Sequence, residues 1–113
     1  MSHNFDAQRR ETFNTFRDMP KGMKKLPERA EVDFLFYPEE HDANYGAVMK
    51  ALTAKGYRCN RDDDLVVAKV GPIPVTPDAI WTHERVATEV ALAYDFYPDG
   101  WDLGLEDQPS SGP

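Results

Sequence analysis

Residues 76–105 read TPDAIWTHERVATEVALAYDFYPDGWDLGL, and this stretch decides the fold of the chain. Thr76 is a good N-cap, Pro77 suits the first helical position because its missing N–H would be unpaired there, and Asp78 complements the helix dipole. These residues predict the start of a long helix. One apolar stripe recurs along it at helical spacing. The stripe comprises Ala79, His83, Val86, Ala87, Val90, Ala91 and Tyr94.

A strand is predicted after this helix. Pro98 bounds the helix, and Asp99 with Gly100 supplies the chemistry of a turn. Apolar and polar residues then alternate with the period of a strand that buries one face. The apolar members are Trp101, Leu103 and Leu105, and the residues between them are Asp102 and Gly104. Because a strand needs others to pair with, we expect the rest of the sheet earlier in the chain.

Five further elements are predicted before this helix. They are a helix over residues 4–18, a strand over 32–37, a helix that Asp42 caps and Gly56 ends, a strand over 57–60 and a strand over 65–70. Polar residues 61–64 make a hairpin turn between the last two strands. The strand over 32–37 is apolar on both faces, which predicts a central position in the sheet.

This order of elements predicts an α+β fold. It is a ferredoxin-like two-layer sandwich, βαββαβ with an antiparallel sheet, preceded by an extra N-terminal helix. We expect the 32–37 and 65–70 strands in the centre and both main helices on one face of the sheet. The chain divides into residues 1–30, an N-terminal helix and basic linker, residues 31–106, the sandwich domain, and residues 107–113, a short disordered tail.

Two surfaces of this fold are left for partners. The sheet face away from the two main helices carries Leu35 and Tyr37. The N-terminal helix carries Phe5, Phe13 and Phe16 within one sector, and these side chains need cover. The cover comes either from the body of the domain, with the open sheet face as one position, or from a second copy of the chain in a homodimer.

Size and composition indicate a single folded domain. The 113 residues are 41% hydrophobic and 12% aromatic. No apolar run approaches the roughly 20 residues that span a bilayer, and residues 1–10 lack the apolar middle of a secretory signal. We therefore expect a cytoplasmic protein that does not contact membranes. The single cysteine, Cys59, excludes an internal disulfide and a cysteine-based metal site.

Charge is unevenly distributed along the chain, whose formal net charge is -7. Residues 1–30 hold seven Lys and Arg against four Asp and Glu, whereas residues 31–113 hold six against sixteen. An acidic domain repels phosphate backbones, which disfavours direct binding of RNA or DNA and favours a basic protein segment as the partner. The alternative is that the acidity only keeps the domain in solution.

No pattern of catalytic residues stands out, and we expect no enzyme, no metal and no cofactor. A phosphate-binding loop is excluded at Gly71 because the following Pro72 lacks the N–H that would bind a phosphate. Glu39, Glu40 and His41 are consecutive potential ligands. They support the alternative of a small-ligand or metal-binding protein that uses the open sheet face.

Three short runs resemble a known family. They are YDFYPDGW at residues 94–101 after a helix rich in alanine and valine, KGY at residues 55–57 before the hairpin, and QRRET at residues 8–12. Together they resemble the RraB family, the bacterial inhibitors of ribonuclease E. Family members with the best-defined role end in a long acidic tail. This chain departs from that pattern, since QPSSGP follows Glu106 and Asp107.

The resemblance implies a ferredoxin-like fold and a non-enzymatic regulator that binds ribonuclease E and lowers its action on RNA. It brings no catalytic residues. We expect contact with the partner at acidic residues of the hairpin and at the final turn. The candidate residues are Asp62, Asp63, Asp64, Asp99, Trp101 and Asp102. Each also has a structural reading, as an ordinary turn residue or, for Trp101, as the start of an edge strand. A fold-only relative that acts as a dimerisation module through the phenylalanine helix is a further alternative.

Overall fold

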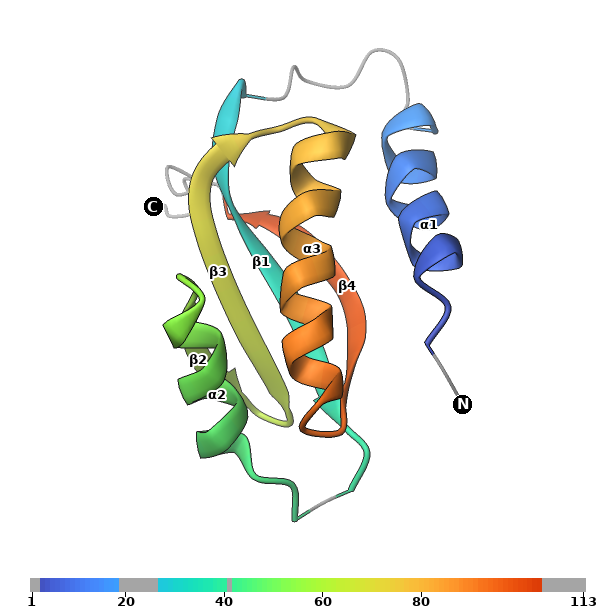
Figure 1. Cartoon of the computed structure of the whole chain (residues 1–113). Helices are drawn as coiled ribbons and strands as arrows, with labels where there is room; N and C mark the ends of the chain where they lie inside the picture. The colour runs from blue at the N-terminus through green and yellow to red at the C-terminus, as the bar shows by residue number, and fades with distance from the viewer. Residues whose placement is uncertain (1–2, 19–26, 41, 105–113) are drawn as a thin grey trace.

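The computed structural model describes residues 3–18, 27–40 and 42–104, which form three helices and one four-stranded sheet (Figure 1). The strand order is β2-β3-β1-β4, and every neighbouring pair is antiparallel. The predicted α+β class is confirmed, and the layout is compatible with a ferredoxin-like sandwich. The elements are α1 (Phe5–Arg17), β1 (Arg29–Pro38), α2 (Tyr45–Ala54), β2 (Arg58–Asp62), β3 (Leu65–Pro74), α3 (Pro77–Leu92) and β4 (Phe96–Gly104).

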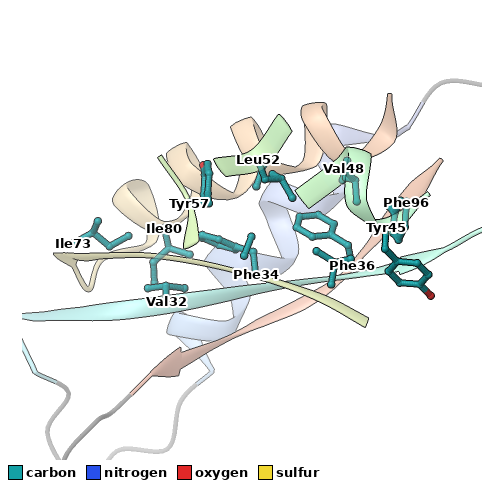
Figure 2. Packing of buried hydrophobic residues seen from close by; sticks show 14 residues of the cluster. Val32, Phe34, Phe36, Tyr45, Val48, Leu52, Tyr57, Ile73, Ile80 and Phe96 are labelled. Carbon is teal, nitrogen blue, oxygen red and sulfur yellow. The ribbon is translucent and has the colours of Figure 1, made fainter. Parts of the chain in front are cut away.

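β1 lies in the centre of the sheet between β3 and β4, as its apolar character on both faces predicts. Val32, Phe34 and Phe36 are almost completely buried under the helices. Figure 2 shows these side chains packed among residues of α2, α3 and the other strands. On the opposite face Leu35 is half-buried and Tyr37 is exposed. Among the described residues, no helix covers that face.

α3 begins where the sequence predicts, because the Thr76 hydroxyl accepts a hydrogen bond from the amide of Ala79 at 3.2 Å. Its buried face differs from the predicted stripe. Ala87 and Ala91 are buried as predicted, but Tyr94 is 40% exposed beyond the end of the helix. The buried positions are Ile80, Glu84, Ala87, Thr88 and Ala91. The stripe is shifted because a second helix covers another side of α3.

That second helix is α1, which lies beside α3 on the side away from α2 (Figure 1). Two aromatic contacts attach it to the domain. Phe5 lies against Trp81 with ring centroids 6.5 Å apart, and Phe16 stacks on Trp101 at 5.8 Å. Phe13 lies under the guanidinium of Arg9. The body of the domain therefore covers two of the three phenylalanines, at α3 and β4 and not at the open sheet face.

Three local predictions are wrong. The hairpin turn comprises residues 63–64 and not 61–64, because β2 continues to Asp62. α2 is capped by Asn44, whose side chain accepts a hydrogen bond from the amide of Ala47 at 3.0 Å, and not by Asp42. β4 begins at Phe96, so the Asp99-Gly100 pair lies inside the strand and not before it. Gly100 has φ +99°, at a position where the register with β1 is irregular. The pair therefore makes a bulge in an edge strand.

Several predicted features lie outside the described residues. They are most of the basic linker, with its lysines at positions 21, 24 and 25, and also His41, Leu105 and the tail over 107–113. Within the described residues, no helix has the length and the apolar character needed to cross a membrane.

Candidate functional site

Three connections of the chain meet at one end of the sheet. The amide of Glu39, after β1, donates to the carbonyl of Asp95, between α3 and β4, at 3.0 Å. The hydroxyl of Tyr45, at the start of α2, donates to the carbonyl of Asp64 in the β2–β3 turn at 3.1 Å. Figure 1 shows these connections at the same end of the sheet. Segments far apart in the sequence are thereby held together.

Seven exposed carboxylates lie in these three connections or directly border them, and we call this set the acidic end. Its members are Glu39, Glu40, Asp42, Asp62, Asp63, Asp64 and Asp95. None of them forms an ion pair with a Lys, Arg or His of the part of the chain that the structure describes. Their charges add to a negative potential that faces solvent.

The basic side chain next to the hairpin aspartates in the sequence, Arg61, is already engaged. Its Nε donates to the carbonyl of Asp63 at 2.9 Å, and its guanidinium lies 3.7 Å from the centre of the Tyr45 ring. These contacts hold the two-residue turn that carries Asp63, whose φ is +60°. Aspartate tolerates this left-handed conformation better than most residues. The turn therefore presents its carboxylates from a fixed backbone.

The acidic end also touches β4 through Glu39. The hydroxyl of Tyr97 donates to the Glu39 carboxylate at 2.9 Å, and this hydrogen bond raises the pKa of Tyr97 above its ordinary value. Tyr97 in turn lies beside Tyr37 on the open face of the sheet, with ring centroids 5.8 Å apart. An aromatic pair therefore borders the acidic end.

The remaining predicted site residues lie elsewhere. Asp99 and Asp102 are exposed further along β4, and Asp102 stands opposite Asp33 of β1. Trp101 is half-buried against Phe16, and its indole N–H donates to the Thr12 hydroxyl at 3.3 Å. The structure thus separates the hairpin aspartates from the β4 residues, and it gives Trp101 a structural contact with α1.

Trp101 belongs to a buried polar network that the sequence did not single out. The Glu84 carboxylate, only 4% exposed, accepts hydrogen bonds from the Thr12 hydroxyl at 2.5 Å and from the Gln8 amide at 3.0 Å. Gln8 also donates to the Thr88 hydroxyl at 3.0 Å. Burial raises the pKa of Glu84, although both hydrogen bonds oppose the shift. The sequence does carry a signal for this network. Gln8 and Thr12 are four residues apart and therefore share one face of α1, and Glu84 and Thr88 share one face of α3 for the same reason.

The side chains at these sites can act on a partner through their charge and through hydrogen bonds. Among residues 3–18, 27–40 and 42–104, no three His, Cys, Asp or Glu side chains are grouped so that they could hold a metal ion. His83 is half-buried, burial lowers its pKa, and its carbonyl accepts from Tyr57 at 2.7 Å.

The chain was compared with family models, with curated proteins and with solved structures. No family model, curated protein or solved structure matches it.

Proposed function

We propose that the protein is a non-enzymatic regulator that binds ribonuclease E in the cytoplasm and lowers its action on RNA. The observation that carries this proposal is the acidic end, where seven exposed carboxylates have no basic partner among the described residues. The resemblance to the RraB family supplies the partner and the ferredoxin-like form of the fold. The occupant of the acidic end is a basic segment of that partner.

Electrostatic attraction of this kind governs how fast partners meet and how strongly salt opposes binding. Exposed ion pairs contribute about 0.2–1 kcal/mol each. Loss of the three hairpin carboxylates is therefore expected to weaken binding about 3- to 150-fold. Salt should weaken the complex further, because the Debye length falls to about 8 Å at physiological ionic strength.

The hairpin variant Asp62→Asn, Asp63→Asn, Asp64→Asn tests the acidic end directly. Asparagine keeps the size of the side chain and tolerates the positive φ of residue 63. The matched control is Asp18→Asn, Glu28→Gln, Asp78→Asn. It removes the same charge from exposed residues at the far ends of α1, β1 and α3.

The measurement is titration calorimetry of each protein against full-length ribonuclease E and against its catalytic half alone, at low and at physiological salt. We expect the unchanged protein and the control to bind the full-length enzyme with micromolar or tighter affinity, and the hairpin variant to bind more weakly. In an RNA-cleavage assay, the unchanged protein and the control should inhibit ribonuclease E equally, and the hairpin variant should inhibit it less. Equal binding by both triple variants would reject the acidic end as the contact, and no binding of any protein would reject ribonuclease E as the partner.

A further inference from the structure

A cleft of about 680 Å³ lies between α1 and the edge strand β4. One wall is formed by α1 residues that include Gln8, Glu11 and Thr12, and the other by β4 residues that include Pro98, Trp101 and Leu103. Glu84 of α3 also lines it. The volume is within the range of small-molecule sites, which are concave and carry a few oriented polar groups. This cleft is separate from the acidic end.

Apart from His3, the ionisable groups of the cleft are all acidic. Glu11, Glu84 and Asp102 line it, and no Lys or Arg is found among the described lining residues. His3 lies at one side, where its ring makes a 2.6 Å hydrogen bond with the Gln8 side-chain oxygen. Of the positive side chains of α1 and α3, Arg9 lies over Phe13 and Arg85 pairs with Glu89 at 3.3 Å.

Glu84 is the unusual member of this set. It is buried, yet its two hydrogen-bond donors, Thr12 and Gln8, are neutral. A carboxylate oxygen accepts two hydrogen bonds, and each oxygen of Glu84 receives one. A buried carboxylate is normally paired with a cation, because desolvation of the charge costs more than neutral donors return. Glu84 lines the cleft, so a cation bound there would lie beside this carboxylate.

The opposite wall suits the same class of ligand. Trp101 lines the cleft, and its indole N–H is held by the hydroxyl of Thr12, which also donates to Glu84. Indole rings attract cations more strongly than other aromatic side chains do. A buried carboxylate and an indole are thus fixed in one cleft by a shared threonine.

We propose that this cleft binds a ligand bearing a guanidinium or ammonium group, for which Glu84 is the counter-ion and Trp101 the aromatic wall. The group belongs either to a free small amine or to a basic side chain of a peptide. The proposal stands independently of the acidic end and of ribonuclease E.

Argininamide is the first probe, and citrullinamide is its neutral counterpart of nearly the same shape. Binding is followed in the whole protein by calorimetry and by the indole N–H signal of Trp101 in NMR spectra, which a Trp101→Phe variant assigns. The tripeptide Gly-Arg-Gly with blocked ends forms the second arm, and it distinguishes a peptide ligand from a free amine. Glu84→Gln removes the charge, and Glu89→Gln on the exposed side of α3 is the matched control.

We expect argininamide or the tripeptide to shift the Trp101 signal, citrullinamide to bind at least 10-fold more weakly, and Glu84→Gln to lose at least 10-fold in affinity. Glu89→Gln should bind like the unchanged protein. If Glu84→Gln fails to fold, Glu11→Gln replaces it, with an expected loss of about 2- to 5-fold for a more distant exposed charge. The proposal is overturned if neither probe moves the Trp101 signal, if citrullinamide binds equally well, or if a folded Glu84→Gln or Glu11→Gln variant keeps full affinity.

Discussion

The Thr12 hydroxyl makes two of the hydrogen bonds that dock α1 onto the domain, and Thr12→Val removes both. Thr12 is 2% exposed, and its hydroxyl donates to Glu84 while accepting from the Trp101 indole. Valine has a similar volume and branching, so the packing and the helix propensity of the position change little. The substitution therefore isolates the two hydrogen bonds.

The expected cost follows from the charges of the partners. A hydrogen bond to a charged group contributes about 1.5–3 kcal/mol, and a neutral one about 0.5–1.5 kcal/mol. The carboxylate loses its 2.5 Å donor in a buried position, whereas the half-buried indole can turn to water. We expect α1 docking to weaken by about 2–4 kcal/mol at neutral pH.

Hydrogen exchange of the α1 amides measures this loss even if the helix detaches without unfolding the domain, and urea unfolding measures the global stability. Thr15→Val is the control within the same helix, because Thr15 is exposed and its hydroxyl bonds, within the described part of the chain, only to the carbonyl of Glu11 at 2.9 Å. We expect this control to change stability by less than about 0.5 kcal/mol.

A double-mutant cycle with Glu84→Gln completes the test. If Thr12 acts through the carboxylate, Thr12→Val should cost at least about 1 kcal/mol less in the Glu84→Gln background. Equal exchange rates for the α1 amides in Thr12→Val and Thr15→Val would refute the reasoning. The same conclusion would follow if the cost of Thr12→Val were unchanged when Glu84 is replaced.

Two other predictions concern pH and the backbone. Because burial raises the pKa of Glu84, the folded chain binds its proton more tightly than the unfolded chain. The free energy of unfolding of the unchanged protein should therefore fall, relative to that of Glu84→Gln, as pH rises from about 4 to 7. Urea titrations of both proteins at several pH values would detect this fall. Parallel curves of unfolding free energy against pH for the two proteins would contradict the prediction. Gly71→Ala should destabilise the protein by about 2–4 kcal/mol, because φ is +124° and the new Cβ would lie 2.9 Å from the carbonyl oxygen of Ala30. Gly46→Ala is the control, and thermal unfolding of both variants is the measurement. We expect Gly46→Ala to gain up to about 1 kcal/mol in stability, since the nearest atom to its new Cβ would be 3.7 Å away. A similar loss of stability at both sites would contradict the prediction.

The secondary structure was largely predictable because its signals are local. The Thr76 cap, the two-faced apolar strand around Phe34 and the glycine after α2 each act within a few residues, and each lies where it was predicted. The errors arose where two local signals competed. Asp42 and Asn44 are both good caps, and only the fold of the preceding loop selects the second. An Asp-Gly pair predicts a turn, yet it is equally suited to a bulge once a strand partner is present.

The candidate site was predictable only in part. The hairpin aspartates were found because three consecutive carboxylates are visible in the sequence. Glu39 and Asp95 joined them through a backbone hydrogen bond between residues 56 positions apart, which no local pattern reports. Trp101 was selected from a short motif, and the structure places it against α1 and away from the aspartates.

The sequence by itself determined the order of the elements, the central position of β1 and the acidic character of the domain. These follow from the period of apolar residues and from charge, which are properties of the chain in any conformation. Only the tertiary structure decided that Glu84 is buried and that seven carboxylates share one end of the sheet. A charged residue next to the apolar stripe of a helix is ordinarily exposed. Glu84 is buried here because α1, which lies some 70 residues earlier in the chain, packs against α3 and covers it. Contacts of that separation depend on the whole packing of the chain and leave little trace in any local stretch of sequence.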